Sequence, residues 1–159
     1  MTAISFGPSS RNRLDAAHDP SADGALAALE SFYHALNHRD LDLLRATWSA
    51  DPLAQLNNPV GGILRSPDAI AALYKAIVAG AVRVQVTFGD VVSYLGDAHA
   101  LYAGRERGTY ATPDGAPVPL EIRTSRYFRY EDGRWRQYHH HGSIDDAAAL
   151  LAYQRAVRG

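Results

Sequence analysis

The sequence contains no cysteine and no long apolar run. Without cysteine the chain forms no disulfide bond and offers no thiol for catalysis, which fits a reducing compartment. No apolar stretch approaches the roughly 20 residues that span a bilayer, and the N-terminus lacks the basic and apolar regions of a secretion signal. We therefore expect a cytoplasmic protein that does not bind membranes.

The chain also lacks an excess of charge of either sign. Its 16 basic and 17 acidic residues give a net charge of −1, and the two signs are interspersed. A nucleic-acid-binding protein needs a concentrated basic face, so we expect no nucleic-acid partner. With 47% apolar residues among 159, the chain can bury one core. We expect a flexible leader at residues 1–23, which are polar and aperiodic, and a single domain at residues 24–159.

The first half of that domain carries helical signals. Apolar residues recur at three- and four-residue spacing after Gly24, and Asp40 and Ser66 are of the type that caps a helix N-terminus. Pro67, at the first helical position, strengthens the signal at Ser66. We expect helices at residues 24–38, 41–48 and 66–80, and a short strand at residues 53–58.

The second half alternates apolar and polar residues, which is typical of half-buried strands. The alternation is clear from Val82 to Phe88 and continues in a long strand at residues 98–112. Two aromatic-rich runs flank Glu131-Asp132-Gly133, a turn composition that predicts a hairpin. A last helix is expected at residues 145–157. This order predicts an α+β domain with its helices on one face of a curved sheet.

The hairpin ends in three consecutive histidines. Alternation along a strand places His139 and His141 on one face and His140 on the other. The neighbouring strand carries several arginines, among them Arg126. Paired imidazoles opposite guanidinium groups predict a site for an anion, because both can donate hydrogen bonds to it.

Two local motifs resemble those of the nuclear transport factor two-like superfamily. Asn57-Asn58-Pro59-Val60-Gly61 is similar to the Glu-Asp-Pro-Val-Gly strand end of ketosteroid isomerases. The hairpin, from Ser125-Arg126-Tyr127-Phe128 to His139-His140-His141-Gly142-Ser143, resembles the calcium/calmodulin-dependent kinase II association domain and SnoaL-like bacterial proteins. The resemblance covers residues 26–143. It implies a cystatin-like fold, in which a cone-shaped, mixed or antiparallel sheet wraps around three N-terminal helices, with a ligand site in the cone.

The same resemblance argues against ketosteroid isomerase activity. It aligns the catalytic base of that family with Asn58, and an amide cannot accept a proton at neutral pH. It aligns the helix-one tyrosine with Phe32 and the oxyanion-stabilising aspartate with Ser125 or Arg126. All three roles are vacant, so we expect no steroid isomerisation.

What remains is a polar pocket with candidate binding and catalytic residues. Arg126 would bind a carboxylate through two parallel hydrogen bonds, and either Arg105 or Arg107 would be the second guanidinium. His139 or His141 would be the acid–base catalyst near pH 7 if a reaction occurs. The other candidate ligand contacts are Asn57, Asn58, Tyr33 and Tyr74.

Structural roles compete with these assignments. Arg126 could instead form an internal ion pair with Glu106 or Glu121, and Trp135 is expected to fill the core. The two asparagines could simply end a strand. A His-x-His pair on a strand could bind zinc, but no third ligand stands at a telling spacing, so we expect no metal and no cofactor.

The sequence therefore predicts a SnoaL-like protein that binds a small, carboxylate-like organic ligand and forms a homodimer through the outer face of its sheet. Two alternatives remain open. One is an enzyme, a cyclase, dehydratase or isomerase, that uses His139 or His141. The other is an oligomeric assembly module similar to the kinase association domain.

Overall fold

The computed structural model describes residues 3–159. A six-stranded sheet has the order β2-β1-β6-β5-β4-β3. Neighbouring strands are antiparallel except for β1 and β6, which are parallel, so the sheet is mixed. The elements in chain order are η1 (Leu14–His18), α1 (Ala22–His38), α2 (Leu41–Thr47), β1 (Gln55–Asn57), β2 (Leu64–Arg65), α3 (Pro67–Ala79), β3 (Arg83–Leu95), β4 (His99–Ala111), β5 (Val118–Glu131), β6 (Arg134–Ser143) and α4 (Ala147–Arg158).

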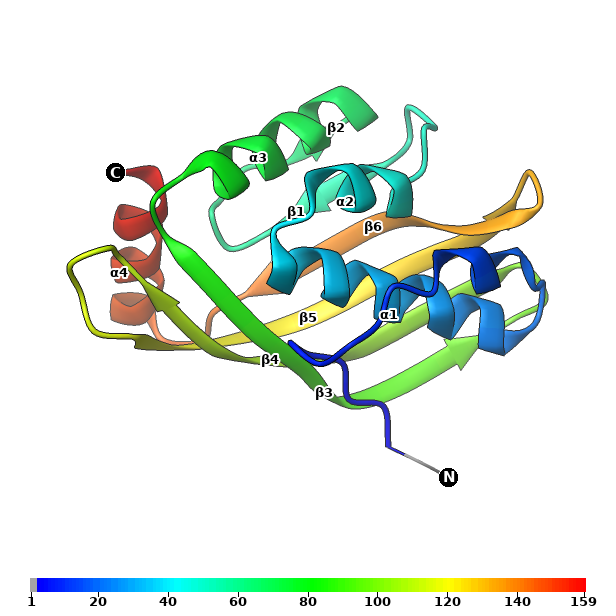
Figure 1. The fold of residues 1–159 in the computed structure, drawn as a ribbon, viewed down its shortest axis with the longest axis horizontal. Helices are drawn as coiled ribbons and strands as arrows, with labels where there is room; N and C mark the ends of the chain where they lie inside the picture. Colours follow the sequence, from blue (N-terminus) through cyan, green and yellow to red (C-terminus); the bar gives the residue numbers. More distant parts are fainter. Residues whose placement is uncertain (1–2) are drawn as a thin grey trace.

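The sheet is curved and open, and α1, α2 and α3 lie on one side of it (Figure 1). This arrangement confirms the α+β cone that the sequence predicts. The helices and long strands also lie close to their expected bounds. The main difference is β3, which continues to Leu95 through a register shift between Gly89 and Val92. Such a bulge increases the local twist of a strand, which suits an edge strand of a curved sheet.

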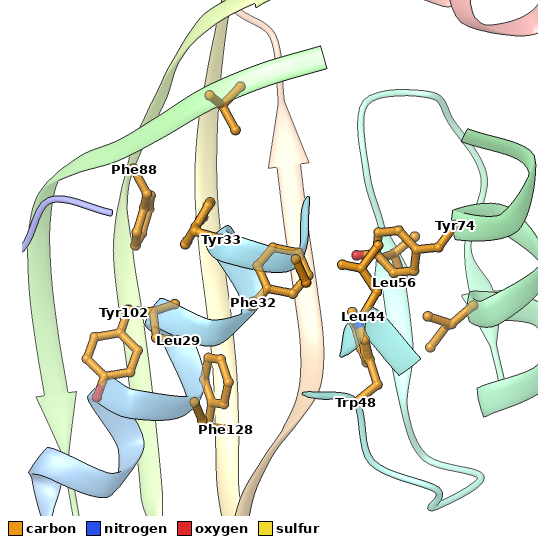
Figure 2. Close-up of a cluster of buried hydrophobic side chains, with 14 of the residues drawn as sticks. Leu29, Phe32, Tyr33, Leu44, Trp48, Leu56, Tyr74, Phe88, Tyr102 and Phe128 are labelled. Atoms are coloured by element: carbon orange, nitrogen blue, oxygen red, sulfur yellow. The ribbon is translucent and has the colours of Figure 1, made fainter. Parts of the chain in front are cut away.

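Helix α1 lies at the centre of the core on the concave side of the sheet (Figure 2). Ser21 caps its N-terminus, since the Ser21 side chain accepts a hydrogen bond from the Asp23 amide. Leu29 and Tyr33 point toward the strands, where Tyr33 stacks on Phe88 with ring centroids 5.2 Å apart (Figure 2). On the next part of the helix surface, Phe32 faces Leu56 and Tyr74 (Figure 2). Helix α1 therefore packs between the sheet and the layer formed by α2 and α3.

A bulge in β6 decides which side chains of that strand face the core. Tyr127 pairs with His139, but Phe128 pairs with Gln137, so Tyr138 is an extra residue in β6. Before the bulge, Trp135 and Gln137 face inward and are buried. Trp135 thus fills the core, as expected. After the bulge the inward positions are even-numbered instead of odd-numbered, because one residue has been added to the alternation.

Helix α4 covers one end of the cone, next to the end of α3 (Figure 1). Tyr153 is its buried anchor, and its ring meets that of Tyr110 edge to face with centroids 5.2 Å apart. The Gln154 amide donates to the Pro59 carbonyl over 3.0 Å, and Arg158 donates to the Val60 carbonyl. These contacts join the C-terminal helix to the loop after β1.

The expected flexible leader needs correction for residues 3–23. Phe6 forms a β-bridge with Phe88, and Arg11 and Arg13 reach Glu30 of α1 over 3.4 Å and 3.2 Å. Glu30 is buried, and a buried carboxylate requires partners. Burial raises the pKa of Glu30, but hydrogen bonds from Arg11 and Arg13 lower it by more. The polar composition of this segment concealed its role as a partner of α1.

Candidate functional site

A small cavity lies between α1, α3, α4 and the inner face of the sheet. Its volume is about 50 Å³. Three charged or titratable side chains line it on adjacent strands, Glu106 on β4, Arg126 on β5 and His140 on β6. Arg126 and His140 are paired across β5 and β6. The rest of the wall is mainly apolar and includes Phe32, Leu36, Ile77, Val84, Val86 and Ile122.

Arg126 is the centre of a buried hydrogen-bond network. Its side chain is 3% exposed, and Nη2 donates to Glu106 Oε1 over 2.8 Å. Nε donates to the Tyr33 hydroxyl over 2.8 Å, and Nη1 donates to Gln137 Oε1 over 2.9 Å. The Tyr33 hydroxyl donates to the same Glu106 oxygen over 2.7 Å. The ring of Phe32 lies 3.8 Å from the guanidinium carbon, in cation–π contact.

This network holds two opposite charges in the hollow of the cone. Burial lowers the pKa of Arg126, but its neighbours Tyr33 and Glu106 raise it by more, so the guanidinium stays charged. The ion pair with Glu106 is the structural alternative that the sequence left open for Arg126. Arg126 and Glu106 therefore neutralise each other. Three of the five guanidinium N–H groups are used in this network.

His140 is neutral and its proton position follows from its contacts. Burial and the charge of Arg126 lower the pKa of His140 well below its ordinary value. Nδ1 lies 3.3 Å from the Ser125 carbonyl oxygen, an acceptor, so Nδ1 carries the proton. Nε2 is then a free acceptor and makes no hydrogen bond within residues 3–159. An unprotonated nitrogen thus lines the cavity beside Arg126.

The predicted orientation of His139 and His141 is wrong. Because of the bulge at Tyr138, these two side chains alternate to the outer face and His140 turns inward. His141 is exposed, and His139 is partly buried against β1, with Nδ1 3.0 Å from the Gln55 carbonyl. Neither side chain lies beside Arg126 in the cavity, so neither His139 nor His141 is placed where the predicted acid–base residue would have to be.

Arg105 and Arg107 also face away from the cavity. Glu106, between them, is the inward residue of β4. Arg105 pairs with Glu121 over 3.0 Å, and Arg107 pairs with Asp90 over 2.7 Å, both in partly exposed positions on the outer side. The prediction of a second guanidinium in the pocket is therefore wrong for both residues. The opposite charge, a carboxylate, occupies that place.

The remaining predicted contacts divide between the two faces. Asn58 lines the cavity, and its Oδ1 accepts a hydrogen bond from the Val60 amide over 3.2 Å. Tyr74 lines it as well, and burial raises the pKa of the Tyr74 hydroxyl. Tyr33 supports the site from behind through Arg126. Asn57 follows the inward residue Leu56 and takes the opposite face of β1.

The sequence indicates Glu106 only as a possible ion-pair partner of Arg126, and it places neither Gln137 nor His140 in the site. The signal for Glu106 was present, because Ala100, Tyr102 and Tyr110 mark the even-numbered residues of β4 as the core side. The signal for His140 was not, since it depends on the bulge. Within residues 3–159 no three His, Asp or Glu side chains are placed to hold a metal ion. In the same range no helix is long and apolar enough to cross a membrane.

Comparison with known proteins places this geometry in a family. The SnoaL-like domain family matches residues 25–147. A proposed calcium/calmodulin-dependent protein kinase type II association domain from Thiobacillus denitrificans is 27% identical, with a TM-score of 0.62; the match covers 76% of this chain and 94% of that chain. None of the curated proteins compared matches the chain.

Two further solved structures share the fold at lower identity. A proposed dehydratase of the NTF2-like family from Streptomyces avermitilis is 21% identical with a TM-score of 0.73, over 81% of this chain and 99% of that chain. A ketosteroid isomerase-like protein from Erwinia carotovora atroseptica is 20% identical with a TM-score of 0.66, over 77% and 94%. These two structures share the fold that the sequence resemblance implies. The chain belongs to the SnoaL-like domain family.

Proposed function

We propose that the cavity binds a small organic ligand through Arg126 and His140. The observation that carries this proposal is the free Nε2 of His140 beside a guanidinium, at the wall of an otherwise apolar hollow. Buried polar atoms nearly always have hydrogen-bond partners. An open acceptor and unused N–H donors at one cavity wall therefore favour a polar guest over an empty core.

The charge balance favours a neutral ligand. The sequence predicted an anionic ligand because its arginines and histidines were the only charge-carrying residues assigned to the site. Glu106 now neutralises Arg126, and His140 is uncharged. A buried carboxylate would have no surplus positive charge to compensate its desolvation. We propose a ligand with a carbonyl or hydroxyl group for Arg126 and His140, joined to a small hydrocarbon body for the apolar wall.

A second candidate function is proton transfer, as in an isomerase or dehydratase. The specific observation in its favour is that His140 is already in the base form, with Nδ1–H fixed by the Ser125 carbonyl. Nε2 is therefore ready to accept a proton at neutral pH, while the lowered pKa makes the imidazole a weaker base than an ordinary histidine. Two similar structures carry names from this class of chemistry, a proposed dehydratase and a ketosteroid isomerase-like protein. In this proposal His140 replaces His139 and His141 as the acid–base residue.

The cavity would have to enlarge to hold an organic ligand. A cavity of about 50 Å³ holds a few water molecules at most, and Tyr153 of α4 forms part of its wall. Helix α4 starts at Ala147, where the match to the family ends. The helix is thus an addition to the shared domain. We propose that its displacement enlarges the cavity and admits the ligand.

Two matched probes test the ligand class. Cyclohexanone and cyclohexanecarboxylate share a ring and differ in charge, and each is titrated into 15N-labelled protein while amide shifts are recorded. We expect cyclohexanone to shift amides around Arg126 and His140, and cyclohexanecarboxylate to shift them less. In His140→Gln the response should weaken, whereas in Arg107→Gln, on the outer face, it should persist. If neither probe shifts these amides, even in a chain shortened before α4, the cavity is not a binding site.

We also propose a homodimer, with the outer face of the sheet and its β3 edge as the contact. Val92, Tyr94 and Leu95 of β3 are more than half exposed, at 54%, 60% and 55%, and exposed apolar clusters mark interaction surfaces. Size-exclusion chromatography with light scattering tests this. A dimer that dissociates in Tyr94→Lys supports the proposal, and a monomeric wild-type chain contradicts it. Larger rings would favour the assembly-module alternative.

A further inference from the structure

We propose that a surface cleft between α2, α3 and β6 binds the phosphate group of a small ligand. The cleft has a volume of about 210 Å³ and is distinct from the cavity, although Tyr74 lines both. Three arginines line it, Arg45 on α2 and Arg134 and Arg136 on β6. None of them belongs to the network around Arg126.

The three arginines have no carboxylate partner. Within residues 3–159 their guanidinium groups form no ion pair, unlike those of Arg105 or Arg107 on the outer face of the sheet. The Nε atoms of Arg134 and Arg136 are buried and make no hydrogen bond in this part of the chain. Buried N–H donors without acceptors are uncommon in folded proteins. Because these Nε atoms are enclosed by protein, an anion in the cleft would bind the terminal Nη groups, and those of Arg45 and Arg136 make no hydrogen bond in the described part of the chain.

Two of these cations lie close enough to repel each other. Burial and the charge of Arg136 lower the pKa of Arg134. Arg134 is nevertheless fixed in position, because Nη2 donates to the Ala46 carbonyl over 2.7 Å in the last turn of α2. An arginine held beside a second positive charge favours an anion between them, since a bound anion offsets their repulsion.

Other groups line the cleft wall. Trp48 is 5% exposed, and its indole N–H is enclosed by protein beside the Tyr74 hydroxyl. Pro67, at the start of α3, lines the same cleft, so the positive end of that helix dipole faces it. Asp68 is the one carboxylate among the described lining residues. Arg136 also borders a neighbouring hollow lined by Asp51, Glu131 and Asp132, so Arg45 and Arg134 carry most of the positive charge of the cleft.

This positive charge selects the chemical class of the ligand. A phosphate monoester carries up to two negative charges and presents several acceptor oxygens, which match planar guanidinium donors. A carboxylate would neutralise only part of the charge. The cleft volume of about 210 Å³ exceeds the needs of a phosphate group, so a small organic body fits beside the Trp48 ring. We therefore assign the cleft to small phosphate monoesters.

The indole signals of the two tryptophans provide an internal control for the test. Phenyl phosphate is titrated into 15N-labelled protein at constant ionic strength, with sodium chloride and phenol as separate controls. We expect a shift of the Trp48 indole N–H signal with phenyl phosphate and with neither control. The Trp135 indole donates to the Asp19 carbonyl over 3.0 Å, away from the cleft, and should not respond. Inorganic phosphate should give a smaller response of the same kind.

Variants decide whether the arginines are responsible. Arg45→Gln and Arg136→Gln should each weaken binding at least about fivefold, because each removes charge-assisted hydrogen bonds. Arg155→Gln, an exposed arginine of α4, should leave it unchanged. The proposal is overturned if phenyl phosphate leaves Trp48 unaffected, or if it binds Arg45→Gln and Arg136→Gln as well as wild type. It is also overturned if these variants dissociate an oligomer while phenyl phosphate has no effect.

Discussion

Removing one partner of the Arg126–Glu106 pair should cost far more stability than removing both. Glu106→Gln keeps the shape of the side chain and a hydrogen bond from Tyr33, but leaves the Arg126 charge buried and uncompensated. Arg126 is 2% exposed, and its neighbours favour the charged form. Breaking a buried ion pair in this way costs about 3–5 kcal/mol. This is a large share of the 5–15 kcal/mol by which domains are stable.

Arg126→Met should behave differently, because the lone carboxyl of Glu106 can bind a proton. Protonating a glutamate costs about 4 kcal/mol at pH 7, and about 1.4 kcal/mol less for each pH unit below that. The stability deficit of Arg126→Met relative to wild type should therefore shrink as the pH is lowered toward 5. That of Glu106→Gln should not shrink in this way, since a guanidinium cannot release its charge in this range.

Urea denaturation followed by tryptophan fluorescence measures both effects, at pH 7 and pH 5.5. The double variant Glu106→Gln/Arg126→Met should cost less than either single change at pH 7, which corresponds to a coupling of at least about 2 kcal/mol. Arg107→Gln is the control, because its ion pair with Asp90 is exposed and should contribute less than about 1 kcal/mol. Single variants as stable as the control, or deficits with the same pH dependence, would refute a buried, mutually neutralising pair.

Three further predictions concern other parts of the molecule. The folded state holds the pKa of His140 below its ordinary value, so the free energy of unfolding should fall as the pH drops below about 6.5. NMR of the imidazole should still show the neutral Nδ1–H form at pH 6. A doubly protonated ring at that pH would contradict this prediction. Tyr153→Ala should lower the free energy of unfolding by about 3 kcal/mol and should increase amide hydrogen exchange in α4 more than in the sheet. An equal increase in both would contradict the proposed displacement of α4. The contacts with Arg11 and Arg13 lower the pKa of Glu30, so the stability that the Glu30 carboxylate contributes is lost as the pH falls through that lowered pKa. At neutral pH, Glu30→Gln should expose Arg11 and Arg13 to trypsin. An unchanged cleavage rate would be inconsistent with an N-terminal segment that packs on α1.

Much of the fold could be predicted from local patterns. Helix α3 begins at Pro67 after the cap residue Ser66, as the sequence predicts. The alternating residues up to Phe88 form the first half of β3, which contains its buried side chains. These signals are local, so a single sequence contains them. The packing of residues 3–23 is not local, because Arg11 and Arg13 are placed by a glutamate of the next helix. No periodicity in the segment itself reveals that contact.

The candidate site was predicted less well, for two physical reasons. First, the inward residue of β4 is Glu106 and not its arginine neighbours. The even-numbered core residues on either side of Glu106 could have shown that even-numbered positions of β4 face inward. Second, the inward histidine is His140 because β6 contains one residue more than its partner strand requires. Bulges depend on how two strands fit together. Arg126 faces the hollow of the cone and forms the internal ion pair that the sequence left open as its alternative role, while its predicted contact with a ligand stays a prediction.

The spare residue in β6 gives that strand an unusual tolerance to changes in length. Tyr138 occupies the bulge, so deleting it would restore an ordinary ladder while Gln137 and His140 kept their present partners on β5. Relatives with one residue fewer at this point would thus present the same chemistry to the interior. Alignments of such chains should place a single-residue gap opposite Tyr138, since an ungapped alignment would equate an interior histidine with a surface one.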